Sequence, residues 1–152
     1  MKRDAILLFA LLLILFPCLL LGQDTGLKVA KKEVKLKYRN GIFSGQSRSV
    51  YTDEPYWGMV TITVRKGLIK DVDYIVRDSV KHETFSEKYE RHFADIPEYV
   101  QQCRNDWKGI QTYPNKFLES QDISKLDAVS GATWSYNIFK ASTEEALKKA
   151  AR

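Results

Sequence analysis

The chain has 152 residues, of which 44% are hydrophobic and 28% are charged, and its formal net charge is +5 at pH 7. This composition is typical of a single globular domain behind a leader, and it excludes a disordered or repeat protein. The positive charge is mild and no base-stacking motif accompanies it, so we expect no nucleic-acid partner.

The N-terminal segment has the layout of an export signal. Lys2 and Arg3 precede an apolar run over residues 5–21. We therefore expect residues 1–22 to be a signal peptide or an N-terminal membrane anchor. Pro17 favours cleavage, whereas the run approaches the length of a spanning helix, so a membrane tether through residues 5–21 stays open. In both cases the remainder is predicted to be extracytoplasmic, in the periplasm or at the cell surface.

Residues 23–36 are rich in lysine and poor in apolar residues. We interpret them as a basic linker, solvated rather than bound to anionic lipid. Removal of the leader would leave Cys103 as the one cysteine, which excludes an intramolecular disulfide and favours packing of this thiol in a helix.

The first strands are predicted around Asn40-Gly41, the strongest short hairpin signal in the chain. Residues 34–39 and 42–50 flank this pair and are expected to form the hairpin.

A second strand pair follows. Residues 59–65 alternate large apolar and hydroxyl side chains, as a half-buried strand does, and residues 68–76 return after Lys66-Gly67. Together these runs predict an antiparallel sheet.

Helices dominate the second half of the sequence. The pattern becomes helical from about residue 85, and Pro97 is well placed to start a short helix that ends near Trp107. Residues 109–126 predict an irregular segment that folds over a bound ligand. A last helix is expected to begin close to Thr133. The fold class is α+β, with an antiparallel sheet from the N-terminal half packed against helices from the C-terminal half.

The most informative stretch, residues 127–135, reads Asp-Ala-Val-Ser-Gly-Ala-Thr-Trp-Ser and leads into this last helix. Backbone N–H groups at a helix start lack intrahelical partners and attract anions, and Gly131 and Ala132 allow a ligand to approach closely. The pattern favours a phosphorylated cofactor. The structural alternative is that Thr133 or Ser130 only caps the helix.

This motif resembles the attachment segment of the FMN-binding domain family, a domain also present in subunits of sodium-pumping NADH:quinone oxidoreductase and of ferredoxin:NAD oxidoreductase. The resemblance extends from about residue 37 to residue 150. A Gly-aromatic-Gly stretch at residues 41–45, a strand-turn-strand unit at residues 58–69 and the trio His82-Glu83-Thr84 support it. It implies that residues 37–152 form an FMN-binding domain.

In that family the threonine corresponding to Thr133 is esterified to the phosphate of FMN by a separate flavin transferase, which takes the FMN from FAD. The resemblance therefore implies that Thr133 is the attachment site. It also implies cofactor-binding roles, in transferase recognition and around the phosphate, for Asp127, Ser130, Gly131, Ala132 and Ser135. No base adjoins Thr133, which agrees with the need for a second enzyme.

The implied function is an exported or membrane-tethered electron carrier with covalent FMN. Its partners would be the flavin transferase, a membrane electron donor and an extracytoplasmic acceptor. No acid, base or second cofactor motif points to a stand-alone enzyme. Two alternatives stay open: a non-redox secreted domain that binds a ligand or a partner protein, and a reductase that holds FMN non-covalently.

Two further groups of residues have side chains that can bind a metal or a flavin ring. His82 and His92 lack metal-ligand spacing, so no metal site is expected. The aromatic residues Tyr56, Trp57 and Trp134 are expected to pack against other side chains rather than stack on a flavin.

Overall fold

A four-stranded antiparallel sheet and two long helices make up the part of the chain that the computed structural model describes, residues 37–152. The predictions for residues 1–36, the leader and the basic linker, lie outside it. The elements in chain order are β1 (Gly41–Gln46), η1 (Ser47–Ser49), β2 (Tyr56–Arg65), β3 (Leu68–Asp78), β4 (Glu83–Thr84), η2 (Glu87–Phe93), α1 (Pro97–Ser120), η3 (Ile123–Lys125) and α2 (Thr133–Ala150). None of the described helices is both long and apolar enough to span a bilayer.

The strands follow one another in the sheet, in the order β1-β2-β3-β4. Alternate residues of β2 are buried, among them Val60, Ile62 and Val64, as the sequence pattern predicted. The turn between β2 and β3 consists of Lys66 and Gly67, whose φ angles are 54° and 72°. Two successive positive φ angles match the twist of a tight hairpin, and this confirms the predicted turn.

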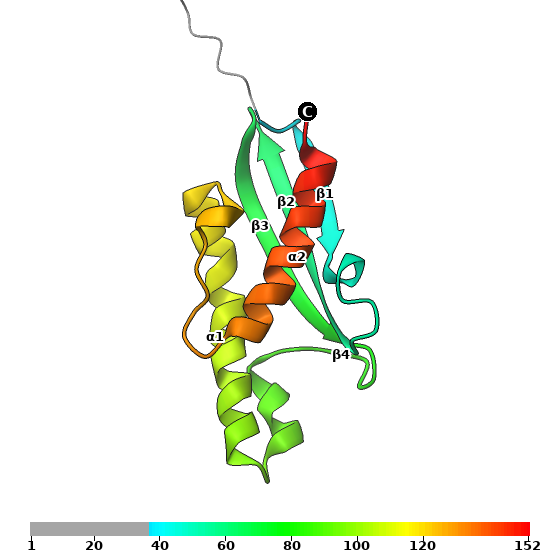
Figure 1. The fold of residues 1–152 in the computed structure, drawn as a ribbon, viewed down its shortest axis with the longest axis vertical. Coiled ribbons are helices and arrows are strands. Elements are labelled where there is room, and N and C mark those ends of the chain that lie inside the picture. The colour runs from blue at the N-terminus through cyan, green and yellow to red at the C-terminus, as the bar shows by residue number, and fades with distance from the viewer. Residues whose placement is uncertain (1–36) are drawn as a thin grey trace, which may run out of the picture. The chain divides into compact units, whose positions relative to one another are not determined.

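Helix α2 lies across one face of the sheet, over β1 and β2 (Figure 1). Two glycines allow this close approach. A Cβ on Gly45 would lie 2.1 Å from the carbonyl oxygen of Ser142, and a Cβ on Gly58 would lie 2.4 Å from Cγ2 of Ile138. The sheet therefore presents bare backbone where the helix crosses it.

Helix α1 contacts β3 and α2 and runs for 24 residues, well past the predicted end near Trp107. The predicted irregular segment at residues 109–126 is therefore wrong for most of its length, and it does not fold over a ligand as a loop. The missed helical signal is the buried stripe Cys103, Asp106, Ile110, Tyr113 and Phe117. Pro114 lies inside the helix, where the burial of this stripe outweighs the loss of one N–H donor.

The predicted hairpin at Asn40-Gly41 is also wrong. Residues 34–36 lie outside the described part, and residues 37–40 form no strand with β1. Tyr38 instead makes an isolated bridge with Ala151, and the Arg39 amide donates to the carbonyl oxygen of Ala150 at 2.8 Å. The backbone of this segment is thus bonded to the end of α2, a partner that a local pattern does not reveal.

Two predicted elements have different limits. Strand β1 ends at Gln46 rather than at Val50, because Ser47 turns into η1 and its hydroxyl accepts a hydrogen bond from the Gly58 amide at 2.9 Å. The helix expected from about residue 85 is the 3-10 helix η2, Glu87–Phe93. The predicted fold class is confirmed: an antiparallel sheet from the N-terminal half packs against helices from the C-terminal half.

Candidate functional site

Thr133 is the first residue of α2 and its side chain is exposed. The residue that caps the helix is Ala132, with no hydrogen bond from a capping side chain. Neither Thr133 nor Ser130 therefore performs the capping role of the structural alternative. Among the described residues the hydroxyl of Thr133 has no hydrogen-bond partner, so it is available for chemistry.

The first amides of α2 divide into two pairs. The Ser135 amide donates to Oδ1 of Asp106 at 3.1 Å, and the Tyr136 amide donates to the carbonyl oxygen of Ala132 at 3.1 Å. Within residues 37–152 the amides of Thr133 and Trp134 have no acceptor. Two N–H groups at the positive end of a helix thus adjoin the exposed hydroxyl, an arrangement that suits a phosphate ester.

Helix α1 fixes the loop that carries these groups. Gln102 donates through Nε2 to the carbonyl oxygen of Gly131 at 2.9 Å. The Tyr113 hydroxyl donates to the carbonyl oxygen of Ala132 at 2.8 Å and accepts from the Val129 amide at 3.2 Å. These side chains hold the loop in one conformation from outside its own sequence.

A buried carboxylate lies beneath the loop. Asp106 is 3% exposed, and its Oδ1 accepts from the hydroxyl of Ser135 at 2.7 Å, while Oδ2 accepts from Nε2 of Gln102 at 2.6 Å. The hydroxyl of Ser135 is fully buried. It therefore connects α2 to α1 instead of lying exposed beside Thr133.

The other predicted site residues share the exposed loop. Asp127, Ser130 and Gly131 are exposed, whereas Ala132 is fully buried against α1. Gly131 has a φ of +75°, a conformation that glycine adopts without strain. The structure thus brings four predicted residues together at one surface and places Ala132 and Ser135 behind it.

An aromatic pocket of about 250 Å³ adjoins the loop. Gln102 and Asp106 line this pocket and also donate to Gly131 and accept from Ser135, respectively. The ring of Trp134 lies near the rings of Tyr56 and Phe85, at centroid distances of 5.3 Å and 5.7 Å. The lining residues are Tyr56, Phe85, Tyr89, Phe93, Tyr99, Gln102, Cys103 and Asp106. A pocket of this size and composition suits a planar ring rather than a whole nucleotide.

Cys103 lies in α1 with 8% exposure, which confirms the predicted packing in a helix. Burial raises the pKa of its thiol, followed by the charges of Asp106 and Glu90. The thiol is therefore protonated at neutral pH and is a poor nucleophile.

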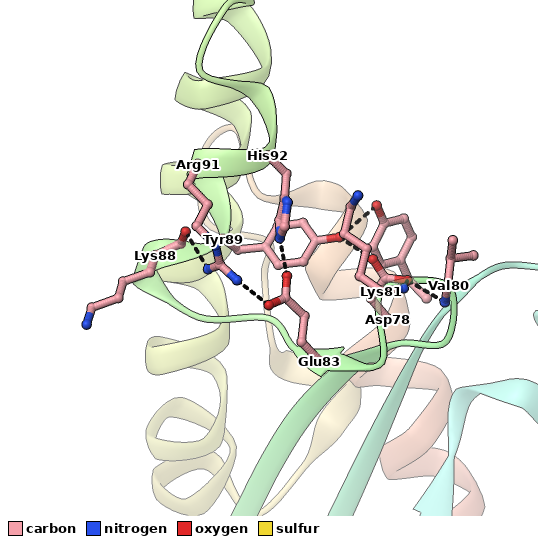
Figure 2. A network of polar contacts seen from close by, with 9 residues as sticks. Asp78, Val80, Lys81, Glu83, Lys88, Tyr89, Arg91 and His92 are labelled. Carbon is pink, nitrogen blue, oxygen red and sulfur yellow. Dashed lines mark hydrogen bonds and ion pairs between the residues drawn. The ribbon is translucent and has the colours of Figure 1, made fainter.

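A polar network joins η2 to the sheet (Figure 2). Glu83 of β4 contacts both Arg91 and His92 of η2, and Asp78 at the end of β3 accepts a hydrogen bond from the hydroxyl of Tyr89. Burial acts to raise the pKa of Glu83, but the hydrogen bonds from His92 and Arg91 outweigh it and lower that pKa. The network attaches η2, and with it one wall of the pocket, to the sheet.

Metal coordination finds no support in residues 37–152, where no group of three or more His, Cys, Asp or Glu side chains is placed to hold an ion. His92 pairs with Glu83, and His82 is exposed.

Sequence reasoning missed Gln102, Asp106 and Tyr113, which hold the loop, and Tyr89 and Phe85, which line the pocket. The first three follow one another in α1 at intervals of four and seven residues, which places them on one helix face, and this was the available signal. No local pattern connects them to residues 127–135, which lie far along the chain.

Comparison with known proteins agrees with this geometry. The sequence model of a family described as the FMN-binding domain matches residues 53–148, which include the loop before α2. The opening stretch at residues 41–45 lies outside the match. No curated protein matches the chain.

The fold is similar to that of a solved protein. The crystal structure of the CPE2226 protein from Clostridium perfringens has a TM-score of 0.52 and 23% sequence identity, over 74% of this chain and 88% of that chain. This likeness concerns the fold alone. The family match covers well over half of the 152 residues and confirms the resemblance seen in the sequence, so the chain belongs to the FMN-binding domain family.

Proposed function

We propose that this protein is an extracytoplasmic electron carrier whose FMN is joined through its phosphate to the hydroxyl of Thr133. The observation that carries the proposal is the exposed hydroxyl of Thr133, which has no partner within residues 37–152, beside two amides that also lack an acceptor there and next to an aromatic pocket. Membership of the FMN-binding domain family identifies FMN as the ligand in this proposal.

The residues present suit the group at both of its ends. The amides of Thr133 and Trp134 would hold the phosphate, and the aromatic side chains around Tyr56 and Phe85 would bind the ring. Bound FMN would supply the acceptance and donation of electrons, and the protein would supply its orientation and electrostatic surroundings.

The described residues contain no base that contacts the hydroxyl of Thr133. A threonine hydroxyl is a weak nucleophile without an activating partner. Formation of the ester would therefore depend on a separate flavin transferase that uses FAD, as the family resemblance implies. Asp127 and Ser130 are exposed on the same loop, where such an enzyme would reach them.

The export signal predicted at residues 1–22 gives the ester a purpose. Outside the cytoplasm a dissociated flavin would be diluted into a medium that does not resupply it, and a covalent bond prevents this loss. The electrons would come from a membrane donor and pass to an extracytoplasmic acceptor.

Intact mass spectrometry of the full chain co-expressed with a flavin transferase tests the attachment. We expect a mass that exceeds the polypeptide by one FMN less one water, and colour that survives denaturation. Thr133→Ala should abolish the added mass, whereas Ser124→Ala, which removes an exposed hydroxyl outside residues 127–135, should retain it. Retention of the added mass by Thr133→Ala overturns the assignment. Colour that is lost on denaturation identifies a reversible flavin instead.

A second measurement tests the carrier role. With NADH and no partner protein, the purified flavoprotein should show no sustained turnover with a small electron acceptor. Sustained turnover would identify a reductase rather than a carrier.

A further inference from the structure

Three segments of the domain meet at the end where the backbone enters it (Figure 1). The amide of Gly67, in the turn between β2 and β3, donates to Oδ1 of Asn40 at 3.1 Å. The side chain of Arg152 donates through Nε to the carbonyl oxygen of Tyr38 at 3.2 Å. The entering backbone, the tip of the β2–β3 hairpin and the end of α2 therefore share one surface.

This surface carries a group of exposed cations. Within residues 37–152 none of these side chains makes an ion pair. We call the surface the basic end and define it by its cations, which are Lys37, Arg39, Arg65, Lys66 and Lys148.

Acidic side chains near the basic end balance only part of this charge. Glu145 pairs with Lys149 at 2.8 Å. Glu144 and Asp122 are half-buried, and Asp71 is exposed. The exposed cations therefore outnumber the exposed carboxylates at this end. Toward the opposite end of the domain, by contrast, arginines of η2 and α1 are paired with glutamates of β4 and η2.

Two aliphatic side chains protrude beside these cations. Leu68 follows the β2–β3 turn directly and is 48% exposed, and Ile42 lies two residues after Asn40 and is 71% exposed. Because side chains alternate along a strand and the next residues, Phe43 and Ile69, pack in the core, both point away from the core. One exposed aliphatic residue is ordinary on a soluble protein, but two beside a group of cations suit contact with a lipid surface.

We propose that the basic end binds the surface of an anionic membrane. Leu68 and Ile42 would enter the boundary between headgroups and acyl chains, and the cations would contact the lipid phosphates. Lysine and arginine suit this position, because their aliphatic stems can lie along apolar groups while their charged ends reach the headgroups.

The sequence outside the described part supports a membrane as the partner. Residues 5–21 are apolar, and residues 23–36 join them to the domain at the basic end. A linker of this length spans at most about 50 Å, so a retained tether would keep the domain near the bilayer. Bound in this way, the domain would hold Thr133 away from the lipid. The inference goes beyond the proposed function and does not depend on the flavin.

A dye that brightens in apolar surroundings tests the contact in the full chain. Nitrobenzoxadiazole is attached at Leu68→Cys or, in a second protein, at Ile42→Cys, both with Cys18→Ser, while Cys103 is buried. The vesicles contain phosphatidylcholine alone or with about one third phosphatidylglycerol. We expect bright, blue-shifted emission on the anionic vesicles and weak emission on the neutral ones, and loss of the difference at high salt.

Two controls accompany the dye measurement. The same dye at Asp95→Cys, an exposed position in the loop between η2 and α1, should stay dim on both kinds of vesicle. Insertion of residues 5–21, where they are retained, would occur in both kinds and leaves the comparison unchanged.

Removal of charge tests the role of the cations. Lys66→Gln combined with Lys148→Gln should lower the equilibrium constant for docking on anionic vesicles by about twenty-five-fold, since each cation near such a surface contributes a factor of about five. The matched control combines Lys88→Gln with Lys108→Gln, which removes the same charge from exposed positions elsewhere and should keep the signal. Circular dichroism checks that each variant is folded.

Equal emission on neutral and anionic vesicles, or an equal loss in the two double variants, overturns the inference. Soluble poly-glutamate that brightens the dye as strongly as vesicles do would identify an acidic protein as the partner and overturn it as well. No flavin enters these measurements, so the intact mass of the protein tests the proposed function separately.

Discussion

The conformation of Gly131 decides how the loop presents Thr133. Its φ of +75° lies in the left-handed region, and a Cβ there would lie 2.5 Å from Nδ2 of Asn105. The positive φ would strain the backbone of any residue with a Cβ, whereas the contact involves only the flexible side chain of Asn105. The two can be separated by mutation.

We predict that Gly131→Ala lowers the free energy of unfolding by about 1–2 kcal/mol, because a residue with a Cβ is strained at this φ. Urea denaturation measures the loss. The control is Gly131→Ala combined with Asn105→Ala, which removes the contact but keeps the strain. We expect the double variant to recover little, since the Asn105 side chain can move aside. Full recovery would show that the contact, not the backbone, requires glycine.

At the scale of elements, α1 supports the start of α2. The carboxylate of Asp106 accepts from both the amide and the hydroxyl of Ser135. A hydrogen-bond acceptor at a helix N-terminus stabilises the helix, and here the acceptor comes from a different helix rather than from a capping residue. The loop that carries Thr133 therefore depends on the packing of α1 against α2.

Asp106→Ala should lower the free energy of unfolding by about 1–3 kcal/mol, because it leaves the Ser135 amide buried without an acceptor, and the Ser135 hydroxyl keeps only the carbonyl oxygen of Ala132, at 3.1 Å. Chemical denaturation measures the change, and hydrogen exchange at the Ser135 amide should become faster. Ser135→Ala is the matched control, since it removes the hydroxyl but leaves the bond from the amide. An equal loss in both variants would contradict the role of Asp106 as acceptor for the helix start.

The elements that were predicted correctly owe their structure to local patterns. The alternation in β2, the Lys66-Gly67 turn and the apolar stripe of α2 are all readable within a few residues. The helix predicted from Pro97 was too short because Pro114 is an unfavourable local signal, which burial of the apolar side chains of α1 overrides. The Asn40-Gly41 hairpin failed because the backbone around Arg39 pairs with the end of α2.

In the candidate site too, the parts set by local sequence could be predicted, and the parts set by tertiary packing could not. The position of Thr133 at the start of α2 followed from the sequence, since a motif and a helix pattern coincide there. By contrast, the hydrogen bonds that link Asp78, Tyr89 and Tyr56 join three separate elements, β3, η2 and β2. These hydrogen bonds depend on how the three elements pack, and the spacing of the residues along the sequence does not predict them.

At the scale of the whole molecule, several carboxyl groups are held ionised by the fold. The pKa is lowered for Asp78, Glu83, Glu90, Asp122 and Glu145. For Glu145 the causes are the hydrogen bond from Lys149 and then that from the Gln46 amide. A carboxyl whose folded pKa lies below its unfolded pKa stabilises the protein above the unfolded pKa, and this contribution is lost as the pH falls.

We therefore expect the free energy of unfolding to be nearly constant from neutral pH to about pH 5 and to decrease steadily toward about pH 3. Denaturant melts at a series of pH values measure this profile. Glu145→Gln should flatten part of the decrease, because it removes one of the shifted groups. A profile that rises or stays level between about pH 5 and pH 3 would contradict the assignment of these shifts.

The pairing of Tyr38 with Ala151 has a consequence for how the domain is held. The backbone enters the described domain beside the end of α2, whereas Thr133 is the first residue of that 18-residue helix (Figure 1). At 1.5 Å per residue, about 27 Å of rigid helix separates the two points. An immobilising surface or a fusion partner joined at either terminus of the domain would thus lie at the far end of α2 from Thr133 and leave the exposed threonine accessible.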